Sequence, residues 1–396
     1  MEYLAYGVLV LTYLGLGLGY WPGYRMNRAA IALTGAALLI VLGVLDFEGA
    51  WRALEPHTLG FLFGVMVLNA HLGYAGFFQL FLYRLVRLAH SPLGMLVWLT
   101  FGTGILSALF LNDTIAILFS PLVLSLSRAL GLPPVPYLLA LAGATNVGSV
   151  ATLTGNPQNI VVGSLSKIGY LDFALALGPV ALLGLLVQVV LLYALYPAVR
   201  SRAPLPPLPS FRFRYSRPLL LKGAAVALGL LGAFLLGYPL AQAALVAAGL
   251  LLWSRRLRSE RFFSRVDWEL LVLFAGLFMV TAAVQALGLL EGVAPLVTTP
   301  LSLMLATVGL SNLISNVPAV LLMHPLVAPG DTQGWLLLAA ASTLAGNLTL
   351  LGSVANLIVA EAARREGYRL GFLEHLRFGL PLTLLTLFLA YVWIYR

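Results

Sequence analysis

The chain has 396 residues, of which 61% are hydrophobic and only 9% are charged, so a soluble globular protein, with about 25% charged residues, is excluded. The formal charge of +9 does not indicate a nucleic-acid partner, because the basic residues cluster in a few loops and are not interleaved with aromatic side chains. Apolar runs of membrane-spanning length recur from end to end, which predicts an all-α polytopic membrane protein.

The first predicted spans are residues 3–20, 28–45 and 58–88. The first of them has no basic residue before it and no convincing small-residue cleavage site, so we expect a retained span and not a signal peptide. The next apolar stretch, residues 92–128, carries L-N-D-T at 111–114 in its middle. Neither half reaches the roughly 20 residues that a crossing needs, so we expect a re-entrant helical hairpin.

Residues 137–165 are predicted to form a broken span. They contain T-L-T-G-N-P-Q-N at 152–159, which cannot continue a helix comfortably because proline lacks a backbone N–H and glycine weakens the turn. Non-helical backbone at membrane depth is tolerated only where protein buries it or a cavity meets it, so such a break is typical of a transport site.

A further span at 172–197 is followed by a Pro-rich segment, residues 200–217, which is predicted to be a semi-stiff cytoplasmic linker. With this segment inside, the alternation of spans places every basic residue except Arg52, Lys167 and Arg396 on the cytoplasmic side. That distribution agrees with the positive-inside rule.

The C-terminal half repeats the same order of elements. Spans are predicted at 219–236, 239–254, 268–289 and 372–395, with a hairpin at 300–328 that contains S-N-V-P at 315–318, and a broken span at 334–362.

Three segments of the two halves align in the same order. F-L-F-G-V-M at 61–66 matches L-F-A-G-L-F at 273–278, residues 112–123 match 316–327, and T-L-T-G-N-P-Q-N-I-V-V at 152–162 matches T-L-L-G-S-V-A-N-L-I-V at 349–359. An internal repeat is therefore predicted. The repeats are residues 1–199 and 218–396, each with about five transmembrane helices, a hairpin and a broken helix. An odd number of crossings in each makes the repeats inverted.

The two hairpin tips and the two breaks are expected to meet near the membrane midplane. Helix ends there offer carbonyls to a cation, and helix starts offer N–H groups to an anion. The predicted substrate-binding residues are Asn112, Thr114, Thr154, Asn156, Gln158, Asn159, Ser315, Asn316, Ser353 and Asn356. The predicted coupling-ion residues are Asn112, Asp113, Thr152, Gly155, Asn316, Thr349 and Gly352.

Asp113 is the only acid placed deep in a predicted membrane segment, where carboxylates are rare and usually functional. The alternative is that it caps a half-helix. No Lys or Arg is expected in the core, so an anionic substrate would be neutralised by dipoles, amides, hydroxyls and a co-bound cation. Asn69, Gln79 and Gln285 either join helices or line a pocket.

No spacing of His57, His71 and His324 resembles a metal site, and no cysteine is present to supply thiolate ligands. We therefore expect no metal beyond a possible Na⁺ and no cofactor. An intramembrane enzyme would need a nucleophile with a base, or a metal cluster, at bilayer depth. The sequence offers neither, so an enzyme is not predicted.

Three motifs resemble the ion transporter superfamily, which includes arsenite-antimonite permeases, citrate transporters and divalent anion:sodium symporters. They are L-N-D-T-I-A-I-L-F-S-P-L-V from Leu111, G-N-P-Q-N-I from Gly155 and S-N-V-P-A-V-L-L-M from Ser315. The hairpin tips of dicarboxylate symporters read S-N-T, whereas the tips here keep only the Asn in common. The N-D at the first tip is more similar to the arsenite-permease branch. The resemblance implies a homodimer whose hairpin-bearing domain moves by an elevator motion.

The sequence thus predicts a secondary active transporter of a small inorganic or carboxylate anion, coupled to Na⁺ or H⁺. It is expected in the cytoplasmic (inner) membrane of the cell, with the anion and the lipid bilayer as partners and no nucleic acid. The alternatives are an arsenite/antimonite efflux permease, whose substrate is largely uncharged at neutral pH, and a Na⁺/H⁺ antiporter.

Overall fold

The computed structural model describes residues 2–207, 215–292 and 294–396. Within these ranges the chain forms 19 α-helices, and the only extended pairing is an isolated bridge between Tyr20 and Asn27. The predicted linker, 200–217, lies partly outside the described residues. The N-terminal helices are α1 (Glu2–Leu18), α2 (Arg28–Val41), α3 (Phe47–Arg52), α4 (Pro56–Ala75), α5 (Phe77–Arg87), α6 (Pro92–Leu109), α7 (Asn112–Ala129), α8 (Pro134–Ser149), α9 (Pro157–Ser166) and α10 (Tyr170–Leu195).

The second half begins after a short 3₁₀ turn, η1 (Pro197–Arg200), and the linker. Its helices are α11 (Arg217–Leu235), α12 (Leu240–Leu252), α13 (Ser259–Phe263), α14 (Trp268–Ala286), α15 (Pro300–Ile314), α16 (Asn316–Met323), α17 (Thr332–Ala345), α18 (Val354–Arg365) and α19 (Phe372–Ile394), with 3₁₀ turns η2 (Ala294–Leu296), η3 (His324–Leu326) and η4 (Leu350–Gly352).

Six of the described helices are long and apolar enough to cross a membrane, namely α4, α6, α10, α11, α14 and α19. The prediction of an all-helical polytopic membrane protein is confirmed.

One predicted span is wrong. Residues 58–88 do not form a single helix but the pair α4 and α5, which meet at Gly76. Gly76 has a φ of 81°, in the left-handed region that ends helices and that glycine adopts without steric cost. The predicted span 28–45 is also shorter than expected, because α2 ends at Val41 and Asp46 caps a separate helix, α3.

Both predicted hairpins and both predicted breaks coincide with helix ends. Helices α6 and α7 are separated at Phe110 and Leu111, and α15 and α16 are separated at Ser315, whose φ is 85°. Helix α8 stops at Ser149 before α9 starts, and α17 is followed by η4 and then α18. Each of these helices therefore has an end inside the molecule, where its terminal backbone groups have no partner within the helix.

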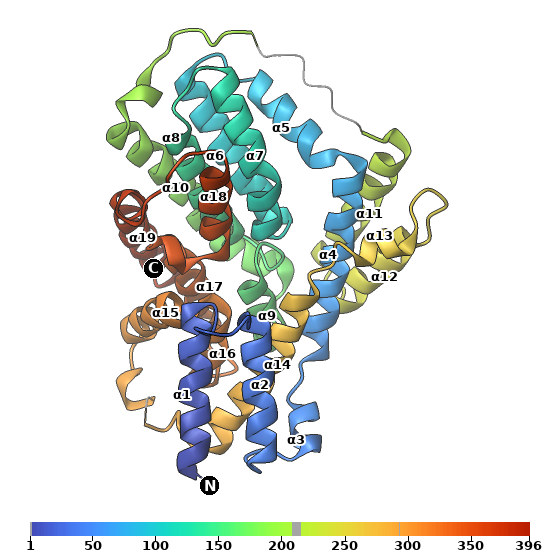
Figure 1. Cartoon of the computed structure of the whole chain (residues 1–396), viewed down its shortest axis with the longest axis vertical. Helices are drawn as coiled ribbons and strands as arrows, with labels where there is room; N and C mark the ends of the chain where they lie inside the picture. The colour runs from blue at the N-terminus through green and yellow to red at the C-terminus, as the bar shows by residue number, and fades with distance from the viewer. Residues whose placement is uncertain (1, 208–214, 293) are drawn as a thin grey trace.

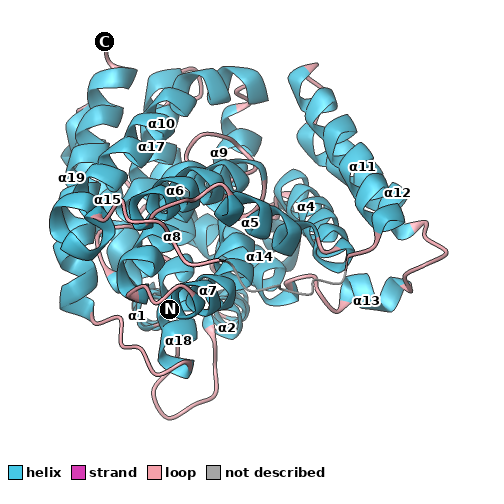
Figure 2. Cartoon of the chain, turned by 90° about the horizontal axis from the view of Figure 1, so that it is seen from above, coloured by secondary structure: helices cyan, strands magenta, loops and turns pink. Residues whose placement is uncertain are grey.

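The broken helices cross each other at the centre. Figure 1 shows α8 above α9, but α17 below α18. The two broken helices, α8–α9 and α17–α18, therefore run in opposite directions. Helix α17 packs against α9, and α18 packs against α7 and α8. Figure 2 places α11 and α12 at one edge of the molecule, outside α4. The four interrupted elements thus form a central unit.

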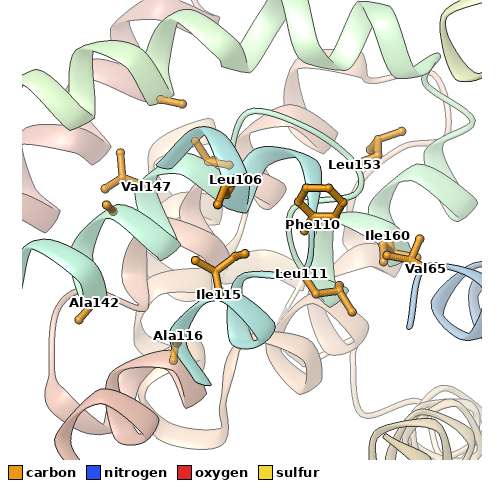
Figure 3. Packing of buried hydrophobic residues seen from close by; sticks show 14 of the residues in the cluster. Val65, Leu106, Phe110, Leu111, Ile115, Ala116, Ala142, Val147, Leu153 and Ile160 are labelled. Atoms are coloured by element: carbon orange, nitrogen blue, oxygen red, sulfur yellow. The ribbon is translucent and has the colours of Figure 1, made fainter. Parts of the chain in front are cut away.

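Apolar side chains surround the first break. Figure 3 shows Phe110 and Leu111 of the first hairpin tip close to Leu153 and Ile160 of the break, and all four are buried. Because dispersion contacts in such a packed interior are numerous, they hold the irregular backbone in one position.

Candidate functional site

The first break is organised by two asparagines. Asn156 caps α9, since its Oδ1 accepts a hydrogen bond from the Asn159 backbone N at 2.8 Å. The Asn159 Nδ2 donates to the carbonyl oxygens of Ser149 (3.1 Å) and Thr152 (2.9 Å). These carbonyls belong to the end of α8 and the irregular segment, where no helical partner exists. The Asn159 amide therefore replaces the missing backbone hydrogen bonds, which a buried helix end requires.

The second break has the same arrangement. Ser353 caps α18 by accepting from the Ala355 N at 3.2 Å. The Asn356 Nδ2 donates to the carbonyl oxygens of Gly346 (2.7 Å) and Thr349 (3.1 Å). In the alignment of 152–162 with 349–359, Asn356 stands at the position of Asn159 and Thr349 at that of Thr152. The aligned residues thus make the same contacts in both halves.

The two breaks bind each other through the half-helices that precede them. Thr343 of α17 donates from Oγ1 to the Asn159 Oδ1 (3.2 Å) and accepts from Asn156 (3.2 Å) and Gln158 (3.3 Å). Asn146 of α8 lies at the aligned position in the first half.

The Asn146 Nδ2 donates to the Asn356 Oδ1 (3.1 Å) and the Asn347 Oδ1 (3.0 Å), and its Oδ1 accepts from the Ser353 hydroxyl (2.9 Å). Asn146 and these partners are all buried. Together with Thr343 and its partners they form one neutral polar network, which we call the central network.

Each hairpin tip contacts the break of its own half. The Asn112 backbone N donates to the Gly155 carbonyl at 2.9 Å, and its Nδ2 donates to the Asn146 Oδ1 at 3.4 Å. With its amide nitrogen turned toward the carbonyls, Asn316 donates to Gly352 O (3.2 Å) and Ser342 O (3.1 Å). The predicted glycines therefore serve through their carbonyl groups, each of which accepts from a tip asparagine.

The predicted threonines of the breaks bind nearby helix ends. The Thr154 Oγ1 donates to the Ala108 carbonyl at 3.1 Å and lies 3.1 Å from the Tyr170 hydroxyl. Thr152 also donates to Ala108, in the last turn of α6. In the second half the Thr349 Oγ1 donates to the Asn312 Oδ1 at 3.0 Å. These hydroxyls fix the hairpins to the breaks.

A cavity of about 240 Å³ lies beside the first hairpin tip. Asp113 and Thr114 of α7 line it, opposite Asn69 of α4 and Gln79 of α5. The Asn69 Nδ2 donates to the Thr114 Oγ1 at 3.4 Å. Among the described residues, neither the Asn69 Oδ1 nor the Gln79 Oε1 has a hydrogen-bond partner, although both atoms are buried. The cavity therefore presents a carboxylate and unpaired acceptor oxygens, which suit a cation or a proton.

The charges around Asp113 come from the loop before α14 and from the start of α2. Arg265 and Asp267, just before α14, line the outer part of the cavity and are exposed. Arg28 at the start of α2 is half-buried and attracts Asp113 electrostatically. Asp113 lies in the first turn of α7. The residue at the N-cap position of this helix is Leu111, and no side chain makes a capping hydrogen bond there. Asp113 is therefore not the residue that caps this helix.

The predicted site residues fall into two groups. Asn112, Asn156, Gln158, Asn159, Asn316, Ser353 and Asn356 join or adjoin the central network, whereas Asp113 and Thr114 face the cavity. Ser315 lies at the second tip in its left-handed conformation. No group of three or more metal-ligating side chains occurs within 2–207, 215–292 and 294–396.

Several members of the site were not predicted from the sequence. Asn146, Thr343 and Asn312 are polar residues inside apolar half-helices, a few residues before each break or tip, and that position was the available signal. His375 of α19 was also missed: its Nε2 lies 3.0 Å from the Asn347 carbonyl, and its buried Nδ1 has no partner in the described chain.

Comparisons with known proteins agree with this architecture. A family model described as citrate transporter matches residues 18–345. The chain is similar to a silicon efflux transporter of Oryza sativa subsp. japonica, with 32% identity over 92% of each chain. It is also similar to an inner membrane protein of Escherichia coli (strain K12), with 29% identity over 90% of this chain and 94% of the other.

A solved structure has the same fold. The crystal structure of the Alcanivorax borkumensis YdaH transporter matches with a TM-score of 0.59 and 18% identity, over 100% of this chain and 96% of that chain. At this identity the likeness concerns the fold alone.

Proposed function

This chain belongs to the citrate transporter family of secondary transporters, and we propose that it moves a small inorganic or carboxylate anion in a cycle coupled to Na⁺ or H⁺ at Asp113. The observation that carries the proposal is the central network, which joins both helix breaks beside the cavity that Asp113 lines. The first hairpin tip contacts this network through Asn112 and Asn146, and the second tip contacts the second break through Asn316 and the Gly352 carbonyl. Interrupted helices that meet in this way are the usual place for substrate and coupling ions in secondary transporters.

The paired hydrogen bonds support two inverted repeats, 1–199 and 218–396, joined by a cytoplasmic linker at 200–217. Asn159 and Asn356 make equivalent contacts at aligned positions, as expected for two copies of one unit. The cross-links from Asn146 and Thr343 hold the four interrupted elements together. In our proposal that unit moves as one body against α4, α11 and α12, which is an elevator motion.

The coupling ion is proposed to bind where the acceptor oxygens are free. The carbonyls of the two breaks already accept hydrogen bonds from Asn159 and Asn356, so they offer less to a cation than the cavity does. Asp113, Asn69 and Gln79 all line the same cavity, and the Asn69 Oδ1 and the Gln79 Oε1 have no hydrogen-bond partner among the described residues. The oxygens of these three side chains suit a Na⁺ ion, whereas a proton needs the Asp113 carboxylate alone.

A second candidate is the efflux of an uncharged oxyacid such as arsenous or silicic acid. The central network is built from amides and hydroxyls without a basic side chain, and such groups bind a neutral polyhydroxyl solute without the cost of desolvating a charge. The similarity to a silicon efflux transporter favours this candidate independently. A plain Na⁺/H⁺ antiporter would not need the network.

We also propose that the protein lies in the inner membrane, as its Escherichia coli relative is named, and that it forms a homodimer. We propose that copies meet at the surface of α11 and α12 at the edge of the molecule (Figure 2), where large apolar side chains such as Leu221, Val246 and Leu250 are exposed.

The test is transport by the purified protein in proteoliposomes. Imposed Na⁺ and H⁺ gradients are combined with labelled citrate, arsenite or silicic acid, and accumulation is measured. We expect accumulation of one substrate class to follow one gradient, and Asp113→Asn to abolish that dependence. Asp172→Asn, which removes an acid outside the site, serves as the control. Flux that ignores both gradients, or full coupling in the Asp113→Asn variant, would contradict the proposal.

A further inference from the structure

A second cavity, of about 330 Å³, lies between α4 and α11 on one side and the first hairpin on the other. Its walls are buried apolar side chains, including Leu68 of α4, Leu106 of α6, the tip residue Phe110 and Leu230 of α11. None of the described residues that line it is charged. Among the described lining residues, side-chain hydroxyls belong to Thr154 and Tyr170 alone, and the two lie 3.1 Å apart and hydrogen-bond each other.

Water is a poor occupant for this space. An ordered water needs two to four polar partners, and the two hydroxyls present already use each other, while Thr154 also donates to Ala108. An empty cavity is unfavourable too, since the lining atoms lose their dispersion contacts. An apolar occupant satisfies both conditions.

The cavity opens sideways through apolar side chains. Ile105 and Leu109 of α6 and Leu228 of α11 line it and are 56%, 39% and 70% exposed. These residues belong to two of the helices that are long enough to cross the membrane, so their exposed faces meet hydrocarbon. A chain of the bilayer can therefore enter without crossing a polar region, and the lining offers no charge that would hold a headgroup.

We propose that one acyl chain of a bilayer phospholipid occupies this cavity and inserts between α11 and the first hairpin tip. The occupant contacts Phe110, which precedes the tip, and reaches Thr154 in the first break. It thereby fills the space between α11 and the central unit. Whether the cavity holds a lipid does not depend on which substrate or coupling ion the protein transports.

Photo-crosslinking tests the proposal. The full chain is placed in nanodiscs that contain a phosphatidylcholine with a diazirine in its acyl chain, and labelled residues are mapped by mass spectrometry after illumination. We expect labels on the buried wall residues Leu106 and Leu230. The variant Ala227→Phe fills the cavity from α11. Its labelling of the wall should fall about tenfold, the change that a loss of ~1.4 kcal/mol in binding produces.

The matched control is Ala225→Phe, on an exposed position of α11 outside this cavity, which should keep wild-type labelling. Ala224→Phe, which also points into the cavity, replaces Ala227→Phe if that variant does not fold. Labels confined to exposed positions such as Leu228, or equal labelling of Leu106 in all variants, would overturn the proposal. Labelling of the wall by a diazirine fatty acid but not by the phospholipid would overturn it as well.

Discussion

In the first break Asn159 binds the carbonyls of Ser149 and Thr152, and in the second break Asn356 binds the aligned carbonyls of Gly346 and Thr349. The side chains next to these two equivalent sets of hydrogen bonds differ. Asp113 at the first hairpin tip is matched by Val317 at the second. The two halves therefore share the hydrogen bonds that close a broken helix, whereas the carboxylate at the hairpin tip is present in the first half alone.

A second difference lies on the helices that follow the breaks. Aligning L-D-F at 171–173 with L-E-H at 373–375 places Phe173 of α10 opposite His375 of α19. Both side chains are fully buried. The Phe173 ring is wholly apolar, whereas the His375 ring has a nitrogen, Nε2, that contacts the Asn347 carbonyl.

Moving the acid between the halves should have the largest effect. In the double variant Asp113→Val with Val317→Asp, the carboxylate leaves the Asn69 and Gln79 oxygens. We expect ion-coupled accumulation in proteoliposomes to fall by about 100-fold, because an intramembrane acid acts only with its partners in place. Coupling in the double variant close to wild type would mean that the tips are chemically equivalent.

Removing the equivalent asparagines should damage both halves alike. Asn159→Ala and Asn356→Ala each remove two side-chain hydrogen bonds to carbonyls of a break, and each hydrogen bond contributes about 0.5–1.5 kcal/mol. We expect both variants to lower the melting temperature in detergent by a similar amount. The control Gln242→Ala, on an exposed face of α12, should leave it unchanged. A large drop in only one asparagine variant would end the equivalence.

The two glycines of the breaks should differ. A Cβ at Gly155 would lie 2.3 Å from the Ser149 backbone oxygen, whereas at Gly352 the nearest atom is the Asn312 side-chain oxygen at 2.8 Å. The backbone cannot yield, but the Asn312 amide can turn. We expect Gly155→Ala to lose roughly 1–3 kcal/mol more stability than Gly352→Ala, measured by thermal unfolding. Gly178→Ala, with open space around it, is the control.

The smallest effect is expected at the ring position. His375→Phe makes the second half resemble the first: it removes the unpartnered Nδ1 but leaves the Asn347 carbonyl without its contact. These changes oppose each other, so we expect a net stability change below about 1 kcal/mol. Phe173→His, which buries a polar ring among apolar groups, should cost more. Equal melting temperatures for the two variants would show that neither site senses the nitrogen.

Sequence patterns were sufficient to predict where the backbone is irregular. Gly155 and Pro157 interrupt one apolar run, and Asn112 and Asn316 interrupt two others at the hairpin tips. Such residues indicate irregular backbone, which a membrane tolerates only where protein buries it or a water-filled cavity meets it. The bend at Gly76 was missed, since a glycine inside a membrane helix usually serves close packing and only its positive φ sets it apart.

The partners within the site could not be predicted. Asn146 and Thr343 each bind the break of the other half, almost 200 residues or more away, and no local pattern carries that information. Asn69 and Gln79 were predicted either to join helices or to line a pocket, but no local pattern indicated that this pocket is the one that Asp113 lines.

The reach of Thr343 has a consequence for biosynthesis. The amides of Asn156, Gln158 and Asn159 find this hydroxyl only after the ribosome has added more than 180 further residues. Until then the nascent N-terminal half holds polar groups in the membrane that the insertion machinery or water must satisfy. We therefore expect neither half to be stable when made alone, and the two fragments to become stable when they are produced together in one membrane.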